Sequence, residues 1–332
     1  MSDFRAEIAT GLDRLFSPES PGGAVEATGL IAEDAIWDVA APVNQLEGRD
    51  AIVGGFVAPL RAAMTGLRRR DEIVIGGDNI RDPGGRWVVI LTHYVGTFAA
   101  PLFGLRPSGR LALLRSGEFY RIEGGRITEA KILFDLPDLA RQAGRNPFPP
   151  DLGTEMLFPG PATHDGVCPG TGDGRASLDL VQAMLSDLHV FDPDTSASPG
   201  QTGDDGVWHD EMLWYGPGGI GSTYRWQGFV DDHRAAFLHA FPDRKGGNHY
   251  CRIGDGNYAA VSGWPSMTMT HQGDYLGVPA TGKALTLRVM DFYRCDFTGP
   301  RGKIAENWVC LDYVDLFGQM GVDLIARANA LP

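Results

Sequence analysis

The sequence lacks long apolar runs, paired cysteines and an excess of positive charge, and each absence excludes a class of protein. No run approaches the roughly 20 apolar residues of a membrane-spanning helix, and the amphipathic N-terminal segment has no signal-peptide core. The cysteines are scattered without CxxC spacing, which predicts free thiols in a reducing compartment: Cys168, Cys251, Cys295 and Cys310. We therefore expect a cytoplasmic protein.

Positive charge is scarce, because 29 Lys and Arg residues stand against 42 Asp and Glu residues, for a net charge of -13. An acidic surface repels phosphate backbones and anionic lipids, so neither nucleic acid nor a membrane is an expected partner. The triplet Arg68, Arg69 and Arg70 is the one cluster that departs from this pattern. It follows a predicted helix, and we interpret it as a solvated helix end, where cations favour the helix dipole.

Signatures of cofactor and metal sites are missing as well. Residues 216–221 match the pattern GxGxxG, but no helix is predicted to open there, as a dinucleotide site requires. His209, Asp210 and Glu211 are adjacent in the chain, so their side chains cannot converge on one ion. The sequence therefore predicts neither a cofactor nor a metal.

What the sequence does contain is an internal repeat. Residues 127–144 align with 304–321 at an offset of 177, and 55–63 align with 228–236 at an offset of 173. The strand-like stretch 115–121 aligns with 288–294 at that second offset, and Trp37 aligns with Trp214. Four blocks in the same order indicate a duplicated domain.

The repeat divides the chain into a first domain (1–145), a linker rich in Pro and Gly (146–174) and a second domain (175–332). Ser177 is a plausible N-cap for the helix that follows the linker. Each copy has an amphipathic helix, a short strand, a second helix (49–66 and 226–240) and then several strands. This order predicts an α+β fold in which helices cover one face of an antiparallel sheet.

Three stretches of the second copy resemble one known family. The run THQGDYLGVPATGKALTLRVMDFYRCDFTGPRGKIAENW at 270–308, WYGPGG at 214–219 and FPD at 241–243 are similar to the SnoaL-like polyketide cyclases. These proteins belong to the nuclear transport factor 2-like superfamily, whose cystatin-like α+β cone has a curved antiparallel sheet and helices. The resemblance covers most of 176–325 and, more weakly, 5–145. It implies two tandem cones.

The resemblance also implies a function. Family cyclases work without a cofactor, so the chain is expected to perform acid/base chemistry of the cyclase, isomerase or hydratase type on a small or polycyclic carbonyl compound. The catalytic aspartate of the family, however, aligns with Val309 and, in the first copy, with Ile132. Neither residue can move a proton, so a non-catalytic protein that binds a small molecule in the same pocket is the alternative.

Alternation along the strand 287–294 places Asp291 and Tyr293 on one face. The family alignment puts this face inside the cone, near Trp214, Val289 and Val309. A carboxylate in such surroundings loses solvation, which raises its pKa towards that of a general base. The alternative is a buried carboxylate that only organises the core.

The same alternation in the first copy places Glu118 and Tyr120 inward, near Trp37. Either tryptophan would stack on a small hydrophobic or aromatic molecule, which is the expected partner. Two histidines complete the candidate set. His271 matches a family histidine and is a candidate catalytic group, and His93 lies on a strand whose register decides whether it faces the pocket.

The outward face of both strands carries the pattern Arg-x-x-x-Phe-x-Arg, with Phe119 and Phe292 at its centre. A face that keeps Phe between two Arg residues suits the packing of one sheet on another. We therefore expect the two copies to form a pseudo-dimer within one chain, which leaves room for a homo-oligomer. Glu129 and Glu306 are expected to pair with arginine across their hairpins.

Overall fold

The computed structural model describes residues 3–17, 27–188, 190–192, 195–196, 198 and 200–332. They form two six-stranded sheets with the same strand order, β2-β1-β6-β5-β4-β3 and β8-β7-β12-β11-β10-β9. The predicted α+β class and the tandem arrangement are confirmed. Each sheet is mixed, however, because β1 runs parallel to β6 and β7 runs parallel to β12.

The elements of the first copy appear in chain order as follows: α1 (Phe4–Phe16), the 3-10 turn η1 (Thr28–Leu30), β1 (Ile31–Val39), β2 (Asn44–Glu47), α3 (Arg49–Ile52), the π turn η2 (Val53–Val57), α4 (Ala58–Ala63), β3 (Met64–Asp78), β4 (Arg86–Phe98), β5 (Leu111–Glu123), β6 (Arg126–Phe134) and α5 (Leu136–Gln142). Those of the second copy are α6 (Gly174–Leu188), β7 (Trp208–Tyr215), β8 (Ser222–Tyr224), α7 (Arg225–Phe229), the π turn η3 (Val230–Arg234), α8 (Ala235–Ala240), β9 (Cys251–Asp255), β10 (Tyr258–Thr270), β11 (Ala284–Asp296), β12 (Lys303–Leu311), α9 (Tyr313–Met320) and α10 (Leu324–Ala330).

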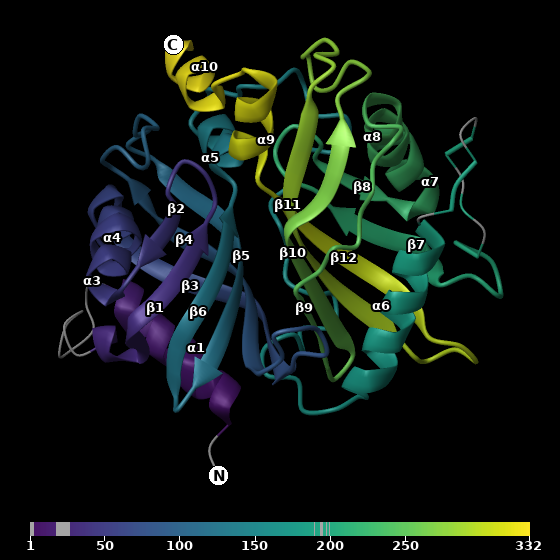
Figure 1. Ribbon diagram of the computed structural model, residues 1–332, viewed down its shortest axis with the longest axis horizontal. Helices are drawn as coiled ribbons and strands as arrows, with labels where there is room; N and C mark the ends of the chain where they lie inside the picture. The colour runs from purple at the N-terminus through teal and green to yellow at the C-terminus, as the bar shows by residue number, and fades with distance from the viewer. Residues whose placement is uncertain (1–2, 18–26, 189, 193–194, 197, 199) are drawn as a thin grey trace.

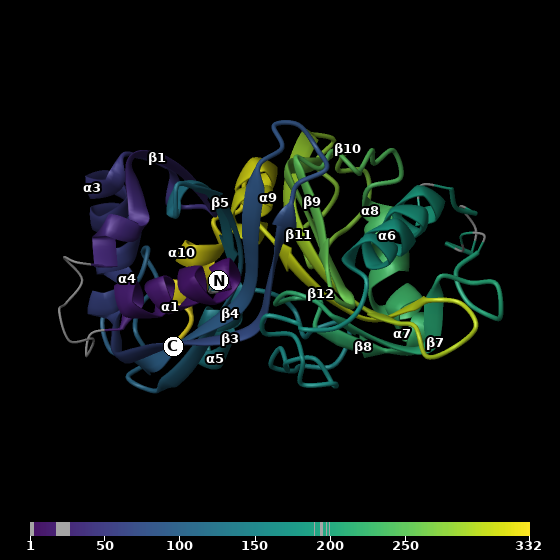
Figure 2. The ribbon, with the colours of Figure 1, turned by 90° about the horizontal axis from the view of Figure 1, so that it is seen from below.

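The two sheets lie back to back in the middle of the molecule, and α1, α3, α4 and α6–α8 cover their outer faces (Figures 1 and 2). Phe119 and Phe292 are fully buried between the sheets, with ring centroids 5.9 Å apart. Both were expected there from strand alternation. In each domain, the helices and the domain's own core therefore pack on the concave face of the sheet. The convex face packs against the sheet of the other domain.

Contacts between the copies follow an approximate twofold symmetry. Asp135 and Asp312 cap the helices α5 and α9, and each also crosses to the other copy. The amide of Gly218 donates to Asp135 at 2.8 Å, and the amide of Ala41 donates to Asp312 at 3.1 Å. Donors and acceptors are both 177 positions apart in the chain (41 to 218, 135 to 312). A self-complementary contact of this kind is typical of a twofold dimer.

Several local expectations need correction. Arg68, Arg69 and Arg70 belong to β3 and do not end a helix, because α4 stops at Ala63. Ser177 is not an N-cap, since α6 already begins at Gly174 and the side chain of Asp173 accepts from the first amides.

The residues 146–173 belong to none of the helices and sheet strands given above, but they are packed against the sheets. The indole of Trp308 donates to the carbonyl of Pro159 at 2.9 Å, and the amide of Ala162 donates to Glu306 at 3.2 Å. Glu306 also pairs with Arg294, as expected from its place in the hairpin. The corresponding pair in the first copy, Arg121 and Glu129, is 3.9 Å apart.

Within the described part of the chain, no helix is both long and apolar enough to cross a membrane. The described residues also contain no group of three His, Cys, Asp or Glu side chains that could hold a metal ion.

Candidate functional site

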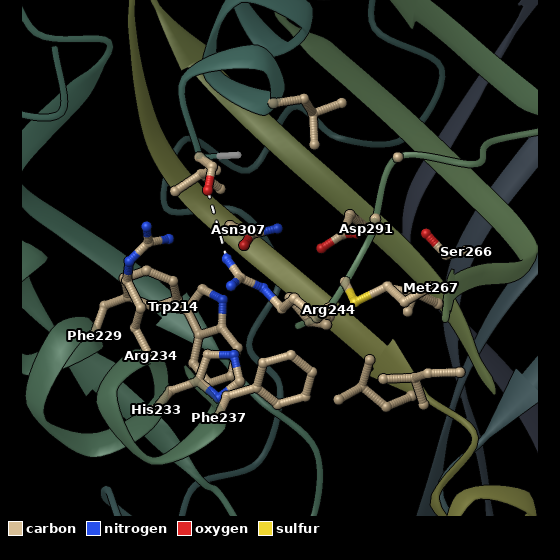
Figure 3. A pocket seen from close by; sticks show the side chains of 18 of the residues that line it. Trp214, Phe229, His233, Arg234, Phe237, Arg244, Ser266, Met267, Asp291 and Asn307 are labelled. Atoms are coloured by element: carbon tan, nitrogen blue, oxygen red, sulfur yellow. Dashed lines mark hydrogen bonds between the residues drawn. The ribbon is translucent and has the colours of Figure 1, made fainter. Parts of the chain in front are cut away.

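The second copy contains a cavity of about 140 Å³ between its sheet and the helices α6–α8 (Figure 3). Trp208 and Trp214 on β7 and Phe229 on α7 form aromatic walls, and β10, β11 and β12 supply the floor. Apolar cavities of similar size, about 150 Å³, hold one benzene ring. The cavity is therefore sized for a single ring or an equivalent small molecule.

Asp291 lies on the floor of this cavity, beside Val289 and Tyr293 of the same strand. Val309 is its direct partner on β12, and Trp214 lies across the cavity. The structure thus brings together the residues that strand alternation and the family resemblance had assigned to one pocket. Burial raises the pKa of the Asp291 carboxyl from 3.8 to about 7, and hydrogen bonds from Asn307 and Tyr293 only partly oppose this effect.

Asn307 belongs to the site and was missed in the sequence. Asn307 follows Glu306 on β12, and the sequence had placed Glu306 on the outer face. Because side chains alternate along a strand, the same reasoning predicts that Asn307 points inward, as it does. Its amide nitrogen donates to the carbonyl of Phe292 at 3.1 Å, which fixes the side chain beside Asp291. Tyr293 keeps its proton at neutral pH, because burial and the nearby Asp291 carboxylate raise its pKa. Both neighbours hydrogen-bond the Asp291 carboxyl.

His233 is a second residue that the sequence did not reveal. It lies on the π turn η3, and such turns are frequent at functional sites. Its ring stacks on Trp214 at 4.4 Å with an interplanar angle of 15°. Burial, assisted by Arg234 and Arg244, lowers the pKa of His233 to about 3, so the imidazole is neutral near pH 7. Its repeat partner is Leu60, an apolar core residue that gave no hint of this role.

Two arginines complete the polar part of the cavity, and the sequence did not single them out either. Arg234 donates to the carbonyl of Ser196 at 2.6 Å and to the hydroxyl of Ser198 at 2.5 Å. Arg244 lies in the irregular segment between α8 and β9 and donates to the carbonyl of Leu188 at 3.5 Å. Burial lowers the pKa of both guanidinium groups to about 10, so both remain charged at neutral pH.

The two candidate histidines are not in this cavity. His271 is fully buried near Phe241, and its Nδ1 accepts from the amide of Thr281 at 3.3 Å. His93 on β4 pairs in register with Arg115, so it faces the neighbouring sheet and approaches Glu72 at 3.6 Å. The structure therefore separates both histidines from Asp291.

In the first copy the corresponding carboxylate is closed off. Glu118 is fully buried, and Arg69 donates to it at 2.8 Å. The hydroxyls of Tyr94 and Tyr120 donate to it at 2.6 and 2.7 Å. Trp37 packs on Tyr120, as expected, and also on Phe56. Phe56 in turn stacks with Phe103 and Phe134 in this core.

The cause of this difference is the strand that follows the second helix. In the first copy β3 has 15 residues and starts directly after α4, so alternation carries Arg69 inward to Glu118. In the second copy β9 has only five residues, and an irregular segment with Gly246 and Gly247 borders the cavity instead. On the next strand Met267 pairs with Leu287, at the place where the first copy has Tyr94. Asp291 therefore has neither the arginine nor the second tyrosine.

Comparison with known proteins identifies the family of the chain. The model of the SnoaL-like polyketide cyclase family matches residues 25–143 and 207–320. Solved structures similar to this chain include a SnoaL-like protein from Jannaschia sp. CCS1 (19% identity over 41% of this chain and 90% of that one, TM-score 0.32). Others are wild-type IdmH from Streptomyces antibioticus (20%, 42% and 98%, TM-score 0.35) and a nuclear transport factor 2-like protein from Burkholderia thailandensis E264 (19%, 43% and 98%, TM-score 0.31).

No curated protein matches the sequence. The family model matches the chain twice, once in each copy of the repeat. The two matched regions cover 119 and 114 residues, together 233 of 332. They contain Asp291, Asn307 and the Glu118 cluster. The chain belongs, with both of its domains, to the SnoaL-like polyketide cyclase family.

Proposed function

We propose that the second domain catalyses cofactor-independent proton transfer on a small carbonyl compound, with Asp291 as the general base. The reaction is of the cyclase or isomerase type, in which a proton leaves the carbon beside a carbonyl group. The first domain acts as a scaffold. The observation that carries the proposal is the position of the Asp291 carboxyl on the cavity floor, without the ion pair that closes the first domain.

In this proposal, Asp291 takes over the role of the family aspartate that the chain lacks. That aspartate aligns with Val309, and Asp291 is the direct cross-strand partner of Val309. Side chains of directly paired residues point to the same face and have Cβ atoms about 5 Å apart. A carboxylate moved to the neighbouring strand therefore reaches the same part of the pocket.

The environment of Asp291 suits a base that works near neutral pH. A general base is most effective when its pKa is close to the operating pH, because both proton uptake and release are then accessible. A pKa of about 7 meets this condition, whereas an exposed aspartate would be a much weaker base.

Two neighbours supply the second half of the chemistry. Proton removal beside a carbonyl leaves negative charge on the carbonyl oxygen, and hydrogen-bond donors aimed at that oxygen lower the barrier. The hydroxyl of Tyr293 and the amide of Asn307 hydrogen-bond the Asp291 carboxylate on the cavity floor, and both can turn to the substrate oxygen once Asp291 has taken up the proton. In the first domain the place of Asn307 is taken by Ala130, which has no such donor.

One observation favours the alternative function, a binding protein without catalysis. The family position for the base is apolar in both copies, with Val309 and Ile132. A protein that had lost the reaction would keep the cavity and could retain Asp291 only as a hydrogen-bond partner for its ligand.

Exchange of carbon-bound protons separates the two functions without knowledge of the natural substrate. We expect the full chain to accelerate deuterium incorporation next to the carbonyl of cyclohexanone in heavy water, followed by proton NMR. The rate should rise with pH through about 7, and Asp291→Asn should abolish the acceleration. Glu118→Gln is the matched control and should keep it. Acceleration that survives in Asp291→Asn would reject Asp291 as the base, and binding of the ketone without exchange would favour the binding protein.

A further inference from the structure

We infer that the cavity of the second domain takes a small ring compound that carries a carboxylate, and that Arg244 binds this anionic group. The inference refines the proposed function by naming the substrate class. It rests on polar atoms of the cavity that have no partner, and a binding protein would show the same selectivity.

Arg244 is charged but has no acidic partner among the residues that the structure describes. One edge of its guanidinium is engaged by the carbonyl of Leu188, and the ring of Phe191 covers one face at 4.9 Å. Its Nη1 atom is buried and has no hydrogen-bond partner within the described part of the chain. A buried charge without a counter-ion is costly, so such a group is a strong site for a ligand anion.

Other polar atoms of the cavity also require a hydrogen-bond partner from the ligand. The indole nitrogen of Trp208 and the hydroxyl of Ser266 are buried in the cavity wall, and neither has a hydrogen-bond partner among the described residues. The Nδ1 atom of His233 is unpartnered too. Guanidinium and indole nitrogens can only donate. The ligand must therefore supply acceptor oxygens, and a carboxylate supplies two that match the fork of an arginine.

The rest of the cavity determines the shape of that ligand. The stacked pair Trp214 and His233 offers a flat surface, and the volume of about 140 Å³ admits one ring. Figure 3 shows Arg244 extending into the space that Asn307, Asp291 and Trp214 surround. A ring compound whose carboxylate binds Arg244 would then lie beside the Asp291 carboxyl.

The first domain has no equivalent of this anion site. Its buried arginine, Arg69, already binds Glu118 at 2.8 Å and Asp71 at 3.0 Å. The buried Arg69 therefore stabilises the fold of the first copy, whereas Arg244 in the second copy can bind a ligand.

The test compares benzoate with benzamide, which has the same ring but no charge, by isothermal titration calorimetry on the full chain. We expect wild type to prefer benzoate by at least about tenfold, as a charge-assisted arginine pair would give. Arg244→Met should remove this preference. The matched control Arg225→Met alters an exposed arginine that pairs with Glu211 outside the cavity, and it should leave the preference intact.

Equal affinity for the two compounds, no binding of benzoate, or a preference that survives in Arg244→Met would each overturn the inference. If Arg244→Met does not fold, Arg244→Lys takes its place. Lysine keeps the charge but loses the forked donors, so the preference should fall several-fold, and an unchanged preference would count against Arg244. Because benzoate has no proton beside a ketone, this result is independent of catalysis. Benzoate selectivity together with failed deuterium exchange would reject the enzyme and retain the anion site.

Discussion

The two domains share a fold, a strand order and an inward carboxylate, yet only one of them keeps that carboxylate accessible. In the first domain Glu118 is bound by Arg69 and two tyrosine hydroxyls, and aromatic rings fill the surrounding space. In the second domain Asp291 borders a cavity, and its hydrogen-bonding neighbours are Asn307 and Tyr293. Of the two copies, one therefore has a closed core and the other has a core with a cavity.

The difference teaches that strand length can decide whether a pocket exists. A β3 of 15 residues carries an arginine into the first core, whereas the five-residue β9 leaves the corresponding place to Gly246 and Gly247. The back-to-back contact of the sheets, with Phe119 on Phe292, lets the closed copy support the open one. A site with an unpaired carboxylate and arginine costs stability, and a well-packed neighbour can offset that cost.

The largest expected effect concerns catalysis in the open domain. Asp291→Asn removes the base but keeps the size of the side chain, so turnover should fall by roughly a hundred- to ten-thousand-fold. Deuterium exchange into cyclohexanone measures this loss, with Glu118→Gln as the control. A loss in Glu118→Gln equal to that in Asp291→Asn would show that the two domains are not divided into site and scaffold.

The next effect concerns stability in the closed domain. Glu118→Gln leaves Arg69 buried with only Asp71 as a charged partner, so the free energy of unfolding should fall by about 3 kcal/mol. Urea denaturation of the full chain measures the change, and benzoate affinity of the second domain should remain the same. A stability change below about 0.5 kcal/mol would mean that the buried pair does not hold the first core together.

A smaller effect concerns the pH dependence of stability. Burial raises the pKa of Asp291 from 3.8 to about 7, so the folded protein binds this proton more tightly than the unfolded chain. The resulting stability is complete below about pH 4 and is lost as the pH rises through about 7. Asp291→Asn has no proton to lose at this position. Its free energy of unfolding, relative to that of wild type, should therefore rise by about 1–3 kcal/mol between about pH 5 and pH 8. Urea curves at both pH values test this, and a constant difference would contradict it.

The smallest effect is expected at His271. This histidine lies outside the cavity, and its Nδ1 is occupied by the amide of Thr281. His271→Gln should therefore change the exchange rate less than about threefold, far below the effect of a lost acid or base. A hundredfold loss with an unchanged melting temperature would restore His271 as a catalytic candidate.

The sequence predicted the parts of this account that depend on repetition and alternation. Offsets of 173 and 177 located the two copies, and the two-residue period of strands placed Asp291, Tyr293 and Phe292 on their observed faces. The same reasoning could have found Asn307, one position from Glu306, because alternation needs only the neighbouring residue.

The remaining features depend on where helices end, which local patterns define poorly. Arg69 looked like part of a solvated helix end, but β3 begins at Met64 and turns this residue into the core. Arg244 lies in an irregular segment, where no periodicity indicates the direction of a side chain. His233 lies on a π turn, which changes the direction of its side chain relative to an ordinary α-helix.

The most direct test of the central claim is a pH titration of the Asp291 carboxyl by carbon NMR, with Asp291→Asn to assign the resonance. We predict a midpoint near pH 7, because the cavity buries this carboxyl without the cation that its counterpart Glu118 has. A midpoint close to the ordinary value of 3.8 would contradict the account. It would mean that the cavity stabilises the charged form of Asp291 as well as water does.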